Sequence, residues 1–263
     1  MIQPQQILQT VFGYDCFRPH QEEIIGRILE GKNAAIIMPT GGGKSICYQI
    51  PAIIREGTAI VVSPLISLMQ DQVDALKQLN VKAEYLNSNL DGGQQYQVIQ
   101  AFQSGTLDLL YVAPERLLMP DFLDLVGRVD LSLLAIDEAH CISQWGHDFR
   151  PAYLNISNTV KNYFSKADSG SGKTLPPIIG LTGTASRSVL NDVQRELNID
   201  GPESVIKPET FNRPELSFER VPIDFSSKLS ALIKCIEDKN TSVQGRDTEC
   251  GLVFCPHVYC CKN

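Results

Sequence analysis

The chain has 263 residues, 43% hydrophobic and 20% charged, a composition that fits a globular protein with one well-packed core and room to begin a second. Its N-terminus lacks the basic and apolar regions of a secretion signal, and apolar runs such as 131–136 are too short to cross a bilayer, so we expect no membrane association. The net charge of −7 argues against a protein that coats nucleic acid, but it is compatible with a local basic and aromatic groove.

Eight cysteines are scattered along the chain, most of them inside apolar segments. This distribution favours free thiols in a reducing compartment over a disulfide framework. A metal site near His257 is not favoured, because the four cysteines around it lack a CxxC pair: Cys250, Cys255, Cys260 and Cys261. With no targeting peptide, we expect a bacterial cytoplasmic protein, with a nuclear location as the alternative.

Six short apolar segments alternate with helical patterns, in the rhythm of βαβ units. The fold class expected is therefore α/β, with a parallel sheet covered by helices on both faces. Two of the helices are expected at 45–54 and 65–79, the second with an apolar stripe facing the sheet: Leu65, Leu68, Met69, Val73, Leu76 and Leu79. The strands are expected at 34–38, 58–63, 83–87, 108–113, 133–137 and 177–183.

A break in the pattern near 207–214 divides the chain. We expect a first domain at 1–207. Residues 208–263 are interpreted as a linker and the incomplete start of a second domain, with a helical pattern at 226–238 and a strand-like segment at 251–255.

The segment MPTGGGKS at 38–45 follows an expected strand and precedes an expected helix, the context that a phosphate-binding loop requires. Its glycines let several backbone N–H groups point at one phosphate chain. Lys44 can neutralise the β- and γ-phosphates, and Ser45 can coordinate Mg²⁺. The expected nucleotide-binding residues of the loop are Thr40, Gly41, Gly42, Gly43, Lys44 and Ser45.

The segment ADSGSGKT at 167–174 has the spelling of a second phosphate loop. It follows no buried-strand pattern, and Pro176 and Pro177 prevent the helix that such a loop must precede. We interpret it as a surface loop.

An apolar strand ends in Asp137-Glu138-Ala139-His140, which places two carboxylates at the carboxyl edge of the sheet, where α/β proteins bind ligands. Asp137 is expected to hold Mg²⁺, and Glu138 to orient or deprotonate an attacking water. An isolated acidic pair is often only a solvated strand end. In combination with the upstream phosphate loop, it predicts catalysis by Lys44, Asp137 and Glu138.

The DEAH sequence and the segment CISQWGHDFRPAY at 141–153 resemble the aromatic-rich loop of RecQ helicases. Other motifs of that family are matched in order over about 10–216: FRPHQEEII (17–25), MPTGGGKS, VVSPLISLMQDQ (61–72), YVAPERL (111–117), GLTGTAS (180–186) and FNRPEL (211–216). The resemblance implies a RecA-like P-loop NTPase domain that uses ATP and Mg²⁺. It also implies single-stranded and partially duplex DNA as partners, 3′–5′ unwinding by the full-length protein, and a role in repair and recombination.

The resemblance further implies adenine recognition by Tyr14, Arg18 and Gln21. An aromatic ring and a guanidinium can sandwich a purine, and a carboxamide can pair with its edge. Without the resemblance, Gln21 would be interpreted as a solvated helix residue.

The aromatic-rich loop is implied to sense single-stranded DNA and to report to the ATP site. Bases stack readily on aromatic and guanidinium groups, and burial of the aromatic rings in the core is the alternative. The residues expected to bind DNA here are Trp145, His147, Phe149 and Arg150.

Three further pairs of residues are given roles by the resemblance. His140 and Gln144 would link the loop to the ATP site. Ser63 and Pro64 would contact the DNA backbone, although Ser63 also suits a helix N-cap. Thr182 and Thr184 would couple hydrolysis to DNA movement, and from the sequence alone they mark a strand end before a helix.

The segment after 255 departs from the family pattern, and the chain shows no arginine finger. We therefore expect a second RecA-like domain in cis to be required, and the isolated chain to hydrolyse ATP poorly and not to unwind DNA. Two alternatives remain at this stage. One is an RNA-dependent ATPase of the DEAD-box type, and the other is a non-catalytic module in which ATP gates DNA attachment.

Overall fold

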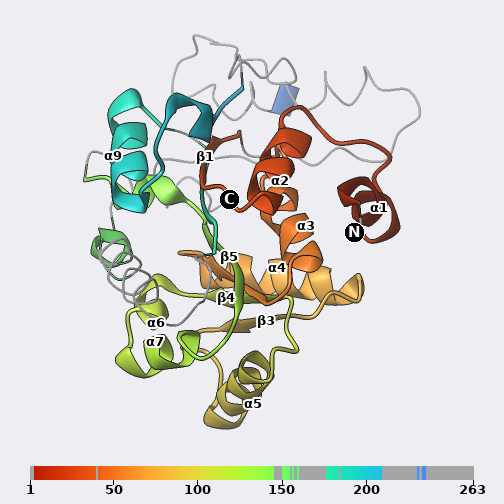
Figure 1. Ribbon diagram of the computed structural model, residues 1–263, viewed down its shortest axis with the longest axis vertical. Coiled ribbons are helices and arrows are strands. Elements are labelled where there is room, and N and C mark those ends of the chain that lie inside the picture. The colour runs from red at the N-terminus through yellow and green to blue at the C-terminus, as the bar shows by residue number, and fades with distance from the viewer. Residues whose placement is uncertain are drawn as a thin grey trace. The chain divides into compact units, whose positions relative to one another are not determined.

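A computed structural model describes residues 3–39, 41–144, 150–154, 156, 159, 176–183, 185–208, 230 and 233–234. In this part of the chain seven parallel strands form one sheet, in the order β3-β4-β2-β5-β6-β1-β7. Figure 1 labels β1, β3, β4 and β5 of this sheet. The α/β class predicted from the sequence is confirmed. The strands are β1 (Ala34–Ile37), β2 (Thr58–Val62), β3 (Ala83–Leu86), β4 (Leu109–Val112), β5 (Leu131–Ile136), β6 (Ile178–Thr182) and β7 (Val205–Ile206).

Helices cover both faces of this sheet, as the hydrophobic clusters show. One face is covered by α2 (Gln21–Leu29), α3 (Ile46–Ile54) and α4 (Ile66–Gln78), with α1 (Pro4–Thr10) packed against α2 and α3. The other face is covered by α5 (Gly92–Gln103), α6 (Pro114–Leu117), α7 (Pro120–Val126) and α9 (Arg187–Leu197), together with the 3-10 helix η1 (Ala139–Ile142). A second 3-10 helix, η2 (Pro202–Ser204), precedes β7.

The central strands are almost entirely apolar because both of their faces are buried, and the few polar side chains within them, such as Thr58 and Ser132, are buried as well. In β2, Ala59 and Val61 pack towards α3 and α4, while Ile60 and Val62 pack towards the opposite helices, and all four are fully buried. Burial of an isoleucine or valine side chain contributes about 1.5 to 3 kcal/mol, so these runs fix the strand positions.

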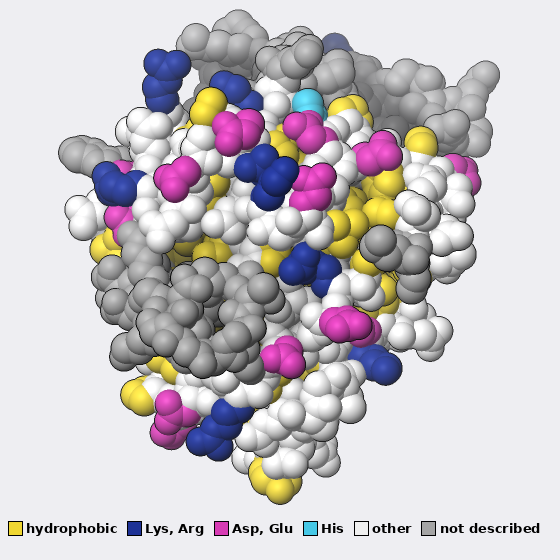
Figure 2. Space-filling model, viewed as in Figure 1, with side chains coloured by type: hydrophobic (Ala, Val, Ile, Leu, Met, Phe, Trp, Pro, Cys, Tyr) yellow, Lys and Arg dark blue, Asp and Glu magenta, His cyan; other side chains and the backbone are white. Residues whose placement is uncertain are grey.

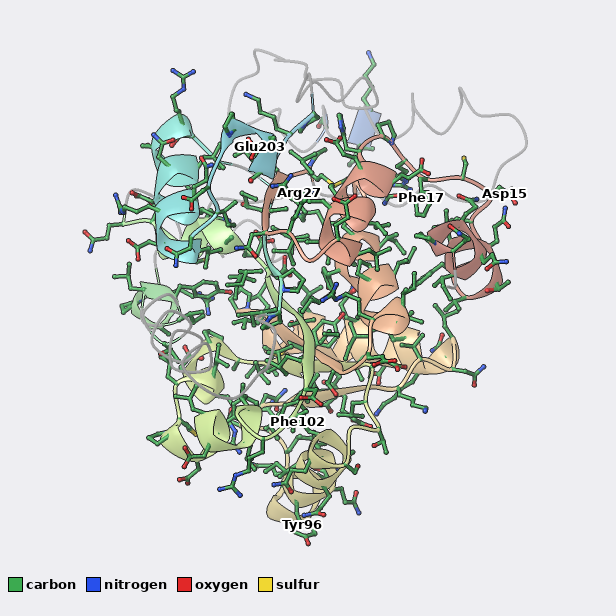
Figure 3. All side chains as sticks on the ribbon, viewed as in Figure 1. Asp15, Phe17, Arg27, Tyr96, Phe102 and Glu203 are labelled. Atoms are coloured by element: carbon green, nitrogen blue, oxygen red, sulfur yellow. The ribbon has the colours of Figure 1, made fainter. Side chains whose placement is uncertain are left out.

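The outer helices follow the amphipathic pattern. Helix α5 begins with a capping box between Asp91 and Gln94, and its Phe102 points into the core and stacks on Phe122 of α7. Tyr96 lies on the opposite side of α5, at the outer edge of the view in Figure 3, and is 64% exposed.

The apolar stripe predicted for α4 is only partly buried. Met69, Val73 and Leu76 are in the core as expected, but Leu65 and Leu79 at the helix ends are exposed. The expectation that the whole stripe faces the sheet was therefore wrong at both ends, because the terminal residues extend beyond the sheet surface that the middle of the helix covers.

The chain divides into two compact units, Met1–Phe211 and Asn212–Asn263. The predicted surface loop at 167–174, the strand-like segment at 251–255 and nearly all of the helical pattern at 226–238 lie outside the described residues. The assignment of 208–263 to a linker and a second domain stays a prediction. Within the described residues, no helix combines the length and apolar character that a membrane span needs.

Gly57 immediately precedes β2 and has a positive φ of +98°. It lies against Asp130, the residue before β5, so replacing Gly57 tests the packing between these two strands. A Cβ at Gly57 would lie 2.5 Å from the Asp130 carbonyl oxygen, whereas at Gly31, with φ +77°, it would meet nothing within 4 Å. We expect Gly57→Ala to lower the free energy of unfolding by about 3 kcal/mol or more, and Gly31→Ala by about 1 kcal/mol, since both pay for backbone strain but only the first creates a clash. Urea unfolding of the two variants measures this difference, and equal losses would contradict it.

Candidate functional site

A cavity of about 390 Å³ lies at the carboxyl edge of the sheet. Residues from the loop after β1, from the ends of β2 and β5, and from the segment before α2 line it. It therefore brings together the phosphate loop, the acidic pair and the segment expected to bind adenine.

The loop after β1 takes a conformation that depends on its glycines. Gly41 and Gly43 have φ values of +78° and +84°, and the Gly42 N–H donates to the Pro39 carbonyl at 2.9 Å. A Cβ at Gly43 would lie 2.4 Å from Nε2 of Gln21. The loop thus forms a close backbone turn at the start of α3, as predicted, while Thr40 lies outside the described residues.

Arg18 and Gln21 fasten the segment before α2 to this loop. Gln21 is 3% exposed; its Oε1 accepts from the Arg18 N–H at 2.9 Å, and its Nε2 donates to the Gly43 carbonyl at 3.0 Å. The Arg18 guanidinium donates to the Gly41 carbonyl. No local sequence pattern predicts these contacts, and adenine recognition by the two residues stays a prediction. Tyr14 lines the same cavity and is 54% exposed.

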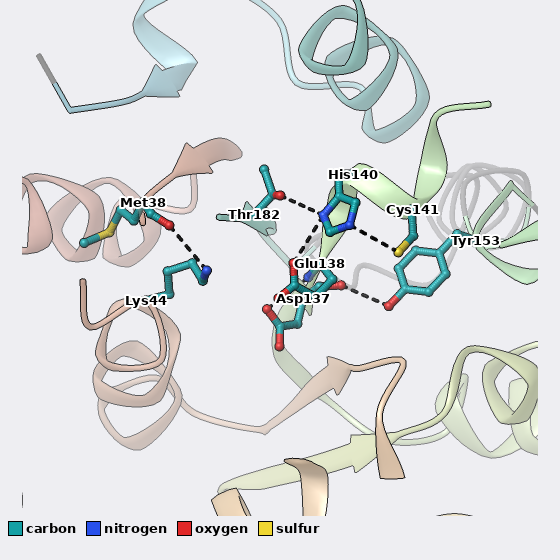
Figure 4. Close-up of polar contacts among 8 residues, drawn as sticks. All are labelled: Met38, Lys44, Asp137, Glu138, His140, Cys141, Tyr153 and Thr182. Carbon is teal, nitrogen blue, oxygen red and sulfur yellow. Dashed lines mark hydrogen bonds and ion pairs between the residues drawn. The ribbon is translucent and has the colours of Figure 1, made fainter. Parts of the chain in front are cut away.

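Lys44 extends into the cavity at the end of the loop. Its Nζ donates to the Met38 carbonyl at 3.3 Å (Figure 4). Burial raises the pKa of Asp137, and the charge of Lys44 opposes this rise. Lys44 and Asp137 are thus electrostatically coupled although they come from different strands.

Asp137 follows β5, and its N–H continues the ladder by donating to the Val62 carbonyl at 2.9 Å. Burial, and then the charge of Glu138, raise the pKa of Asp137 to about 6, against the smaller opposing effects of the Glu138 N–H and Lys44. A cation beside this carboxylate would offset the cost of ionising it.

The cavity fits Mg²⁺ by the chemistry of its donors. Ser45 and Asp137 supply a hydroxyl and a carboxylate oxygen to one cavity, the hard ligands that Mg²⁺ prefers. The glycine loop beside them leaves no room for a side chain at Gly43. The geometry therefore suits a phosphate chain with its magnesium ion.

Glu138 has a left-handed backbone conformation with φ +48°, which is uncommon for a residue other than glycine. This conformation begins η1 and brings a Glu138 carboxylate oxygen to 3.2 Å from Nδ1 of His140 (Figure 4). Nδ1 also lies 2.9 Å from the Thr182 hydroxyl at the end of β6. Hydrogen bonds to Cys141 and Glu138 raise the pKa of His140, which favours a protonated ring.

The described residues at the two ends of the aromatic-rich loop form hydrogen bonds to other parts of the domain. The Arg150 guanidinium donates to the Pro64 carbonyl at 3.0 Å, and the buried Tyr153 hydroxyl donates to the main-chain oxygen of Asp137 at 3.0 Å. On the other side, Ser143 Oγ donates to Asp192 of α9 at 2.6 Å.

These loop contacts were not predicted, because they join segments far apart in the sequence. Gln144 is exposed. The DNA-sensing roles proposed for the loop stay predictions, and the following members of the predicted set lie outside the described residues: Trp145, His147, Phe149 and Thr184.

Ser63 was expected on a DNA-binding surface, but it is 2% exposed and lines the cavity. A direct contact between its hydroxyl and DNA is not favoured by this burial. Nearby, Tyr48, Tyr111 and Gln72 also line the cavity, and the sequence had indicated none of them as site residues.

Acidic and basic side chains are interspersed over the face drawn in Figure 2. On this face the described basic residues do not gather into one broad patch, which agrees with the net charge of −7.

Comparisons with known proteins identify the family of the chain. The DEAD/DEAH box helicase family matches residues 18–193. The chain is similar to "ATP-dependent DNA helicase RecQ" of Pasteurella multocida, at 43% identity over 95% of this chain and 36% of the relative. It is similar to the Bacillus subtilis protein of the same name, at 45% identity over 82% of this chain and 35% of the relative.

The chain thus spans about a third of the length of these curated relatives. Among solved structures, the Pyrococcus furiosus Hef helicase domain has a TM-score of 0.53 at 20% identity, covering 79% of this chain and 39% of that one. The helicase MrfA bound to DNA has a TM-score of 0.58 at 15% identity, covering 79% and 29%. These two likenesses support the fold. From the family match and the curated relatives, the chain belongs to the DEAD/DEAH box helicase family, and its sequence is that of a RecQ-family member.

Proposed function

We propose that the chain is the ATP-binding motor domain of a DNA helicase, in which ATP hydrolysis is coupled to binding of single-stranded DNA. In the full-length protein this activity would drive 3′–5′ unwinding of duplex DNA in repair and recombination. The observation that carries the proposal is that Lys44, Ser45, Asp137 and Glu138 all line one cavity at the carboxyl edge of the sheet. The relatives are named ATP-dependent DNA helicases, which supports the choice of nucleotide and substrate.

Each part of ATP has a counterpart in the cavity. The loop amides and Lys44 would hold the phosphates, and Tyr14, Arg18 and Gln21 would hold the adenine. The contacts of Arg18 and Gln21 to the loop carbonyls support this, since they place the adenine-binding segment against the phosphate-binding one.

Ser45 and Asp137 would hold Mg²⁺, which, when bound, neutralises developing charge on the phosphate oxygens. Glu138 would orient the attacking water and accept its proton. The contact between Glu138 and His140 fixes one end of this carboxylate, so that it faces the cavity from a set position.

DNA would reach this site through the aromatic-rich loop. The contacts Arg150 to Pro64 and Tyr153 to Asp137 provide a physical connection from the end of that loop to the metal-binding strand end. A second RecA-like domain in cis would supply the arginine finger, a contribution of about 10³ to 10⁵ in rate. We therefore expect full activity from the full-length protein, in the bacterial cytoplasm or the nucleus.

Replacing Lys44 tests the nucleotide site in the present chain. We expect Lys44→Ala to weaken binding of a fluorescent ATP analogue in Mg²⁺ about 10- to 100-fold, because a charge-assisted contact to phosphate is lost. Lys32→Ala is the matched control, since Lys32 is exposed and pairs with Glu30. Unchanged affinity in Lys44→Ala would sink the proposal that this cavity binds ATP.

Replacing Glu138 separates an enzyme from a binding module. In the full-length protein, Glu138→Gln is expected to keep nucleotide affinity and to lose about 100-fold or more of the DNA-stimulated ATPase rate, because the general base is removed. Glu115→Gln, an exposed change on α6, serves as the control. Stimulation by single-stranded RNA in preference to DNA, or a turnover rate indifferent to Glu138, would count against a DNA helicase.

Replacing Asp137 tests the electrostatic cost of the metal site. Because the pKa of Asp137 is raised from 3.8 to about 6, the folded protein holds this proton more tightly than the unfolded chain does. Ionisation of Asp137 therefore lowers the free energy of unfolding as the pH rises above 3.8, and this loss is complete above about pH 6. We expect Asp137→Asn to raise the free energy of unfolding of the nucleotide-free chain by about 1 to 3 kcal/mol at pH 8, and by less at pH 5.

Urea unfolding in EDTA at the two pH values measures this effect, with Asp74→Asn on the exposed side of α4 as the control. If the variant is no more stable than the wild type at pH 8, other groups of the protein already offset the cost of the Asp137 charge without a cation.

A further inference from the structure

Ser63 is a buried serine in the lining of the nucleotide cavity. It follows β2, the strand beside β5, and its N–H donates to the Val112 carbonyl at 3.1 Å. Its side chain is nearly inaccessible, and its Oγ has no hydrogen-bond partner among the residues that the structure describes. An unsatisfied buried hydroxyl is costly, so a group bound in the cavity that hydrogen-bonds to it would remove this cost.

The strand register places Ser63 beside Asp137. Val62 pairs with Ile136, and the Asp137 N–H donates to the Val62 carbonyl. Ser63 and Asp137 are therefore the next residues on two adjacent parallel strands, and side chains at matching positions lie on the same side of the sheet. Both residues line the cavity, so Ser63 and Asp137 are neighbours in its wall.

Three other polar side chains that line the cavity, those of Tyr48, Tyr111 and Gln72, take part in side-chain hydrogen bonds. The hydroxyls of Tyr48 and Tyr111 lie 3.2 Å apart. Gln49 Nε2 lies 3.2 Å from the Tyr111 hydroxyl and donates to Gln72 Oε1 at 3.1 Å. Ser63 differs from them in having its hydrogen-bonding capacity unused within the described part of the protein.

Ser132 provides a comparison inside the same sheet. It is 1% exposed, and its Oγ also has no partner in the described residues, but it does not line the cavity. A buried hydroxyl alone is therefore not a sign of a site here. The position of Ser63 on the cavity wall, next to a carboxylate that suits Mg²⁺, distinguishes the two serines.

We propose that Ser63 is a positioning residue of the metal site, whose hydroxyl binds a water molecule in the hydration shell of the Mg²⁺ held by Ser45 and Asp137. Mg²⁺ usually keeps several of its waters in proteins, and outer-shell groups that bind such waters fix the ion's orientation. The inference rests on the proposed function, and it assigns Ser63 to the nucleotide side instead of the DNA side.

The test compares Ser63→Ala with Ser132→Ala in the present chain. At a fixed concentration of a fluorescent ATP analogue, the Mg²⁺ concentration for half-maximal binding is measured. We expect it to rise about tenfold in Ser63→Ala and to stay unchanged in Ser132→Ala. Binding of the same analogue in EDTA should be equal in both variants and the wild type. In an Asp137→Asn background, Ser63→Ala should have no further effect, because the ion that links the two residues is lost.

The remaining outcomes overturn the inference. An unchanged Mg²⁺ requirement in Ser63→Ala would show that its hydroxyl does not act on the ion, and an equal loss of binding in Mg²⁺ and in EDTA would assign it a purely structural role. Wild-type protein that binds no nucleotide, with Lys44→Ala indistinguishable from it, would overturn the proposed function as well. If wild type binds and Lys44→Ala does not, only the Ser63 inference is at stake.

Discussion

The parallel pairing of β5, β6 and β1 determines where chemistry can take place in this domain. The register matches Ile136 to Gly180 and Ile37 to Thr182, so the three strands end at one edge. Residues separated by about ninety positions in the chain, the phosphate loop after β1 and the acids after β5, are thereby brought to one cavity. Without that pairing, the phosphate loop and the acidic pair would not lie in one cavity.

The cavity keeps an acidic group where water is scarce. The burial of Asp137 raises its pKa, and Glu138 adds a second negative charge, so the empty site is electrostatically unfavourable. Lys44 offsets part of this cost, and a metal–nucleotide complex would offset more. The residues proposed to bind the ligand would thus make the domain less stable in its absence, a common relation between stability and function.

The features that could be predicted from the sequence are those that produce a local sequence pattern. Buried parallel strands appear as uninterrupted apolar runs, which is why six strands were placed to within a few residues, while the two-residue β7 left no pattern. The phosphate loop and the acidic pair were found from their context. Three other features depend on tertiary packing between distant segments, and no local pattern predicts them. They are the hydrogen bond from Gln21 to Gly43, the hydrogen bond from Tyr153 to Asp137, and the burial of Ser63.

The contact between Tyr153 and Asp137 uses the main-chain oxygen of the aspartate and not its carboxylate. Any side chain at position 137 therefore leaves this hydrogen bond available. The hydrogen bond that holds Tyr153 and the charge at the proposed metal site can therefore be changed separately. Tyr153→Phe removes the hydrogen bond and keeps the Asp137 carboxylate. A substitution at position 137 removes the carboxylate and keeps the hydrogen bond. Protein engineers can use this separation to tune nucleotide binding without redesigning the loop.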